Sequence, residues 1–168
     1  QPDCAPTLKK LAGRPGFFHH PVALTSQAGD VRMFVQEQDT GAHIVWKENE
    51  HEANFTAQGV TLDDLFVSKC ASADRILLKL DLQGHEMIAL RGAARLLPKV
   101  EVVLTEMSFF RQFHEPTVPE LVDFFDAAGF DLYDIAALSA RTRDGRLRQG
   151  DGVFVRRESA LMRDGGWH

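Results

Sequence analysis

The sequence has little cysteine and no long apolar run. Its two cysteines, Cys4 and Cys70, lie far apart and form neither a metal-binding spacing nor a disulfide framework, which predicts reduced thiols in a cytoplasmic protein. No segment approaches the roughly 20 apolar residues that a membrane-spanning helix requires, and no charged-then-apolar signal segment is found at the start. We therefore expect no membrane partner.

Blocks of basic residues and internal repeats are also missing. The chain carries 19 lysines and arginines against 24 aspartates and glutamates, a formal net charge of −5, which argues against nucleic acid as a partner. Its 168 residues are 44% hydrophobic and 26% charged, values that are ordinary for a globular protein. We expect one domain over residues 1–168, with residues 158–168 as a tail.

Hydrophobic periodicity and turn residues predict alternating strands and helices. Residues 37–59 are polar and irregular, which favours a solvated loop, with a lid over a ligand as the alternative. The alternation beyond them predicts an α/β fold with a mostly parallel sheet covered by helices, and an antiparallel last strand at one side. The expected strands are 17–24, 31–36, 76–82, 100–105, 130–135 and 152–156, and the expected helices are 6–12 (capped by Thr7), 61–66 (capped by Thr61), 85–97 (ended by Pro98) and 119–128.

Residues 76–86 carry the strongest functional pattern. A buried strand leads into Asp81, a tight turn follows at Gly84, and His85 and Glu86 open a helix. Ligands of open α/β sheets bind just beyond the carboxyl ends of strands, so chemistry is expected there. The structural alternatives are that Asp81 is a turn or cap residue, that His85 is a packing residue, and that Glu86 complements the helix dipole.

A second carboxylate follows the next predicted strand. One helix joins the two strands, so a right-handed crossover makes them neighbours, and Asp81 and Glu106 meet at one edge. Such a pair can act as a general base, bind a ligand or hold a divalent cation. A local ion pair of Glu106 with Arg111 is the alternative. The loop after Glu106 adds Arg111 and His114 as candidate substrate contacts.

Four segments resemble the FkbM-type methyltransferase family, which uses S-adenosylmethionine. They are residues 20–24 with Gly29; residues 61–63 with 78–86 and 90–93; residues 105–106; and residues 129–130 with 151–155. Residues 78–86, with the sequence Leu-Lys-Leu-Asp-Leu-Gln-Gly-His-Glu, are the most specific. The resemblance covers residues 17 to 157.

The resemblance implies a Rossmann-like class I methyltransferase sheet and O-methylation of a hydroxyl on a small-molecule acceptor, a sugar or a secondary metabolite. Gln83 stands where the family often has glutamate, which weakens any divalent metal site. The implied roles are as follows: Asp81, His85 and Glu106 as catalytic residues; Ala23, Leu24, Thr25, Asp81 and Leu82 as cofactor contacts; Glu86, Arg111 and His114 as substrate contacts.

No glycine-rich turn of the Gly-x-Gly type follows a strand in this sequence. In such methyltransferases that turn receives the cofactor, so we expect the N-terminal strands of the sheet to be missing and the chain alone to bind the cofactor poorly. The exposed sheet edges would then favour a homo-oligomer. The alternative function is a non-catalytic or truncated methyltransferase-like domain that acts as an interaction module.

Overall fold

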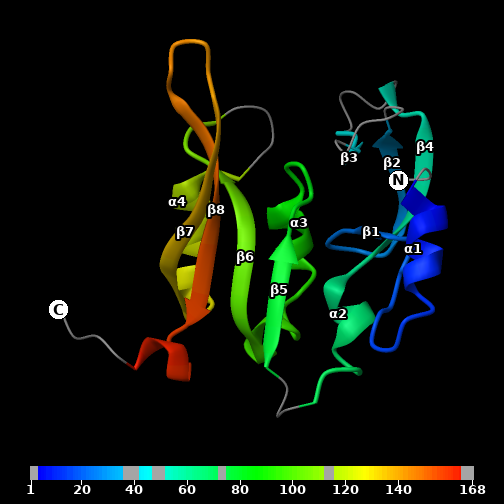
Figure 1. The fold of residues 1–168 in the computed structure, drawn as a ribbon, viewed down its shortest axis with the longest axis horizontal. Helices are drawn as coiled ribbons and strands as arrows, with labels where there is room; N and C mark the ends of the chain where they lie inside the picture. The colour runs from blue at the N-terminus through cyan, green and yellow to red at the C-terminus, as the bar shows by residue number, and fades with distance from the viewer. Residues whose placement is uncertain (1–3, 36–41, 47–51, 72–74, 112–115, 164–168) are drawn as a thin grey trace.

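The computed structural model describes residues 4–35, 42–46, 52–71, 75–111 and 116–163. These residues form two four-stranded sheets with short helices between and beside them (Figure 1). Within the described ranges, no helix has the length and apolarity needed to cross a bilayer.

The first sheet, sheet A, has the strand order β1-β4-β2-β3. Its strands are β1 (Ala23–Leu24), β2 (Gly29–Phe34), β3 (His43–Ile44) and β4 (Phe55–Val60). β1 runs parallel to β4, whereas β2 is antiparallel to both β4 and β3. Helix α1 (Ala5–Leu11) precedes the sheet and begins after Cys4, so the prediction of Thr7 as its cap was wrong.

The second sheet, sheet B, has the strand order β5-β6-β8-β7. Its strands are β5 (Ile76–Leu80), β6 (Val100–Ser108), β7 (Phe130–Arg141) and β8 (Leu147–Arg156). β5 and β6 are parallel, as predicted, and β8 is antiparallel to both of its neighbours. The last strand is therefore antiparallel, as expected, but it lies between β6 and β7 and not at one side.

Helices α3 (Glu86–Arg91) and α4 (Val118–Ala127) pack on one face of sheet B (Figure 1). The buried side chains of that face include Leu90, Val103 and Phe154, and the Phe154 ring stacks on Phe125 of α4 at 4.2 Å. Leu77 of β5 points to the opposite face and is 63% exposed. Burial on one face of the sheet thus supplies the main hydrophobic core.

Two helix caps that the sequence indicated are present. Thr61 begins α2 (Leu62–Phe66), and its Oγ1 accepts the backbone N–H of Asp64 at 3.0 Å. Gly129 follows α4 with a φ of 83°, a left-handed conformation that suits glycine at a helix end. The described residues also include the short 3₁₀ helices η3 (Leu97–Lys99) and η4 (Ala160–Met162).

Several sequence-based expectations need correction. Among the described strands, each sheet has one parallel and two antiparallel pairings, so two mixed sheets replace the mostly parallel one. Residues 37–59, predicted as a loop, contain β3 and all of β4 except Val60; β4 was missed because its apolar–polar alternation is short, from Phe55 to Gln58, and ends at Gly59. Only Ala23 and Leu24 of the predicted strand 17–24 are paired, and β7 extends to Arg141.

The helix predicted for residues 85–97 ends at Arg91 because a tertiary contact intervenes. Gly92 follows, and the Asp63 carboxylate accepts the backbone N–H groups of Arg95 and Leu96 at 3.0 and 2.7 Å. Pro98 lies inside η3 and therefore does not end the helix. A Cβ at Gly92 would lie 2.5 Å from the carbonyl oxygen of Thr25, so only glycine allows sheet A to approach α3 this closely.

We expect Gly92→Ala to lower the free energy of unfolding by about 1–3 kcal/mol, because the added methyl group meets a backbone oxygen that cannot move away alone. Gly13→Ala is the matched control, since a Cβ there lies 3.6 Å from its nearest neighbour, the carbonyl oxygen of Lys10. Urea unfolding of both variants measures the difference. Equal stability of the two would contradict the proposed role of this contact.

Candidate functional site

The turn after β5 leaves sheet B at Leu80 and runs through residues 81–84 into α3. Gln83 adopts a φ of 53° and Gly84 a φ of 96°, so two successive residues are left-handed. Such a conformation is unfavourable for a residue with a side chain and is concentrated at functional sites. The turn therefore needs contacts that hold it in place.

The buried carboxylate of Glu86 supplies those contacts. Its Oε1 accepts the backbone N–H of Leu82 at 2.7 Å and that of Gly84 at 3.4 Å. Glu86 is 1% exposed, and burial raises the pKa of its carboxyl group although the two N–H groups act in the opposite direction. The sequence predicted a substrate contact, whereas the structure places Glu86 beneath the turn.

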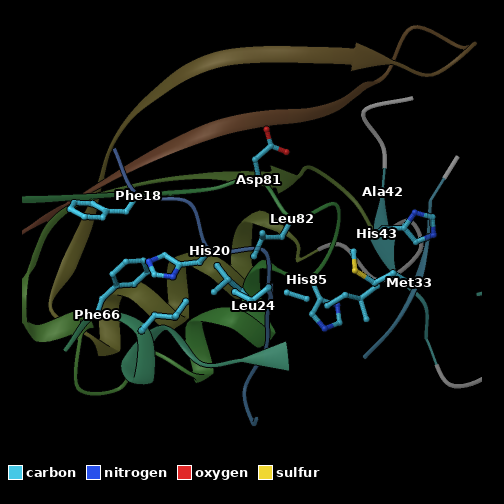
Figure 2. A pocket seen from close by; sticks show the side chains of 14 residues that line it. Phe18, His20, Leu24, Met33, Ala42, His43, Phe66, Asp81, Leu82 and His85 are labelled. Atoms are coloured by element: carbon cyan, nitrogen blue, oxygen red, sulfur yellow. The ribbon is translucent and has the colours of Figure 1, made fainter. Parts of the chain in front are cut away.

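Asp81 lies at the start of the turn with half of its side chain exposed. Lys79 Nζ donates to its Oδ2 at 3.1 Å, and Gln83 Nε2 donates to its Oδ1 at 3.0 Å. In Figure 2, its carboxylate points away from the aromatic and histidine side chains. The group is thus oriented by two donors and remains accessible to a ligand.

His85 occupies the N-cap position of α3 and is 7% exposed. Its ring packs against the indole of Trp46, with 5.3 Å between the ring centroids. Trp46 was not predicted as a site residue, because a single aromatic residue in a largely polar segment shows neither helix nor strand periodicity. This contact joins the segment after β3 to the turn after β5.

A cavity of about 390 Å³ lies between the two sheets, and the turn after β5 forms one of its walls (Figure 2). Four of the five predicted cofactor contacts line it, together with His85. Thr25, the fifth, is buried beside β1 and is not a lining residue. The lining residues are Phe18, His20, Val22, Ala23, Leu24, Met33, Ala42, His43, Ile44, Leu65, Phe66, Asp81, Leu82 and His85.

Several walls of this cavity were not anticipated from the sequence. Phe18 is 82% exposed, and Phe66 packs edge-on against the ring of His20 at 6.0 Å. Met33 and His43 come from the hairpin of β2 and β3. The run Phe-Phe-His-His at residues 17–20 is the sequence feature that could have identified Phe18, whereas the hairpin residues have no such feature.

Glu106 lies beside the turn but does not line the cavity. Leu80 of β5 pairs in register with Thr105 of β6, so Asp81 and Glu106 follow at the same edge of the sheet, as predicted. β6 continues to Ser108, and Glu106 faces Asp151 of β8 in the strand register. The two carboxylates are therefore neighbours on the sheet, and Asp81 alone contributes to the cavity.

Arg111 belongs to a second cavity of about 490 Å³, which Trp46, Gly84 and Arg91 also line. Its Nη2 donates to Oε1 of Glu120 at 2.6 Å, so its ion partner is Glu120. This bond and those from Thr117 lower the pKa of Glu120 to about 2. His114, the other predicted substrate contact, lies outside the described residues.

The role of Glu86 as an acceptor for the turn predicts a difference between two substitutions. Glu86→Gln keeps an oxygen that accepts both N–H groups, so we expect it to be at least as stable as the parent at pH 7. Glu86→Ala leaves both donors unsatisfied and should lose about 1–3 kcal/mol of unfolding free energy.

The stability of the parent and of Glu86→Gln should depend differently on pH. Its folded-state pKa is raised above the unfolded value, so the parent loses stability as pH rises from about 4.5 through the folded-state pKa. Glu86→Gln lacks this loss, and its advantage in urea unfolding should therefore grow from pH 4 to pH 7. An advantage that shrinks over this interval would refute the assignment.

Three comparisons with known proteins bear on this site. A family model described as the methyltransferase FkbM domain matches residues 10–132. No match was found among curated proteins or solved structures. In the part of the chain that the structure describes, no three histidine, cysteine or acidic side chains are grouped to hold a metal ion. The matched range includes the cavity, the turn after β5 and both carboxylates, and the chain belongs to the FkbM methyltransferase domain family.

Proposed function

We propose that the protein takes part in S-adenosylmethionine-dependent O-methylation of a hydroxyl on a small-molecule acceptor, a sugar or a secondary metabolite. The observation that supports this most strongly is the convergence of Ala23, Leu24, Asp81 and Leu82 on one cavity. Residues more than 50 positions apart, implied as cofactor contacts by family resemblance, line the same space. Its volume lies within the range of small-molecule sites.

The cavity walls suit the two chemical parts of the cofactor. Phe18, Leu24 and Phe66 provide apolar and aromatic surface of the kind that an adenine ring stacks on. Asp81 lines the same cavity with its carboxylate turned away from the aromatic walls, and its negative charge at that rim would favour a cationic sulfonium. When bound, the cofactor supplies an electrophilic methyl group.

Asp81 is the residue we assign as general base. Its exposed carboxylate could accept the proton of the acceptor hydroxyl, while Lys79 and Gln83 keep it oriented. His85 is the second candidate, but its burial against Trp46 leaves less access. We give Glu106 and Arg111 the role of orienting the acceptor, and Glu86 that of positioning the turn.

The alternative function is a domain that keeps the sheet and acts as an interaction module. The exposure of Leu77 on the open face of sheet B favours it, as does the position of β5 as an edge strand. Either feature would also allow a homo-oligomer. Cytoplasmic location stays a prediction.

Cofactor binding separates the two functions. We expect S-adenosylmethionine at millimolar concentration to shift the NMR amide signals of Ala23, Leu24 and Leu82, even where affinity is low. Phe18→Ala should weaken this binding about threefold to tenfold through lost ring stacking. Phe55→Ala is the control, because Phe55 is also exposed and lines a different cavity. Unperturbed signals at saturating cofactor would favour the interaction module.

Catalysis is tested at Asp81. With a panel of hydroxylated small molecules, formation of S-adenosylhomocysteine should fall roughly 100-fold or more in Asp81→Asn, because the amide cannot accept the hydroxyl proton. Asp131→Asn is the control, since Asp131 is comparably exposed and ion-paired to Arg157, on β7. Unchanged turnover in Asp81→Asn would remove Asp81 from the mechanism.

A further inference from the structure

The hairpin of β7 and β8 forms an arm, which we define as residues 138–150; its tip, residues 140–148, extends beyond the last β6 pair. β6 pairs with β8 only from Val102 to Ser108, opposite Val155 to Gln149, whereas β7 and β8 continue to the pair Arg141 and Leu147. Figure 1 shows this orange hairpin rising past the ends of β5 and β6. The tip of the arm is therefore a two-stranded projection into solvent.

The arm is basic although the chain as a whole is acidic. It contains four arginines (Arg141, Arg143, Arg146 and Arg148) and one aspartate, a net charge of +3 in a chain of −5. Arg141, Arg143 and Arg146 are exposed. The acidic residue, Asp144, is held by the turn itself, since it accepts hydrogen bonds from Thr142 Oγ1 and from the Arg146 backbone.

Local contacts fix the direction of these arginines. The guanidinium of Arg146 lies over the ring of Phe110 at 4.2 Å, and Arg141 Nη1 donates to the carbonyl of Gly145 at 2.8 Å. The ion pair of Arg146 with Asp144 is long, at 3.6 Å, and exposed. The arm thus gathers more cationic than anionic groups around one turn.

An apolar stripe runs from the arm along β7. Three β7 residues lie opposite every second residue of β8: Leu132 opposite Phe154, Ile135 opposite Gly152, and Leu138 opposite Gly150. Since every second residue of a strand points to the same side, the three β7 side chains share one face of the sheet. The three β7 side chains are 38%, 40% and 59% exposed. A Cβ at Gly150 would lie 3.3 Å from both Leu138 and Phe109, so this glycine lets Phe109 join the stripe.

The geometry and chemistry of this surface disfavour two kinds of partner, a second copy of the chain and a nucleic acid. The register of β7 against β8 shifts between Leu132 and Asp134 and between Ile135 and Ala137. Such bulges interrupt an edge strand and oppose addition of a strand from a second copy. A nucleic acid would satisfy the arginines but would leave the apolar stripe in water.

We propose that the arm docks on the surface of an anionic lipid bilayer. Arginines at the tip of an exposed apolar stripe match that surface, since the guanidinium groups pair with headgroup phosphates while the apolar side chains enter the boundary of the acyl region. This proposal departs from the expectation of no membrane partner, which rested on the lack of a spanning or signal segment; surface docking needs neither. The inference rests on the arm and the apolar stripe beside it, and does not depend on methyl transfer.

Vesicle co-sedimentation of the 168-residue chain tests the proposal. We expect binding to phosphatidylcholine vesicles that contain phosphatidylglycerol, little binding to phosphatidylcholine alone, and loss of binding at high salt. Replacing Arg141, Arg143 and Arg146 together by glutamine should weaken binding about fivefold per arginine, roughly 100-fold in all. Leu138→Ser should weaken it about threefold or more through lost apolar contact.

Matched variants control for net charge and for exposed apolar surface. Glutamine at Arg14, Arg91 and Arg163 removes the same charge from other exposed positions, and Leu161→Ser alters an exposed leucine outside the arm; both should bind as the parent does. Equal loss in these controls, equal binding to neutral vesicles or no vesicle binding at all would overturn the proposal. So would duplex nucleic acid binding without vesicle binding, or a dimer in sedimentation equilibrium that Leu138→Ser abolishes.

Discussion

The close approach of Thr25 to Gly92 is the contact on which the rest of the structure depends. It brings the end of β1 in sheet A against the residue that follows α3, which packs on sheet B. Asp63 reinforces it, because its backbone N–H donates to the Gly92 carbonyl at 3.0 Å and its carboxylate binds the next turn. Since the cavity takes walls from both sheets, its shape depends on this junction.

A buried carboxylate performs a second structural task at the same site. Burying Glu86 is unfavourable for the charged form, and the structure offsets part of this cost with the N–H groups of Leu82 and Gly84. In return the turn keeps Gln83 in a left-handed conformation, from which its side chain reaches Asp81. One hidden acid thus orients one accessible acid, and the two have separate roles although only five positions separate them.

Sheet B has two chemically different ends along its strand order. At the β5 end, the parallel strands β5 and β6 bring Asp81 and Glu106 to one edge, beside the cavity. At the other end, the β7–β8 hairpin leaves the sheet as a basic arm with an apolar stripe. Phe109 and Phe110 follow β6 and contact this arm, so the segment that continues to Arg111 connects the arm with the second cavity.

Local sequence determined the features that depend on neighbouring residues. The apolar run before Asp81, the cap at Thr61 and the glycine after α4 act over a few positions, so the strand, the helix start and the helix end were predictable. The family, and the edge shared by Asp81 and Glu106, also followed from the sequence, because motif spacing and parallel pairing preserve them.

Tertiary structure alone decided what depends on distant partners. β4 is a strand because β1 and β2 supply its hydrogen bonds, and its own apolar–polar alternation is too short to predict a strand. Helix α3, which begins at Glu86, ends at Arg91 because Gly92 contacts Thr25 and Asp63. Both partners lie more than 20 positions away in the sequence. Burial likewise decides the role of Glu86. A carboxylate can bind a substrate or accept backbone N–H groups, and only the surrounding packing selects between these two interactions.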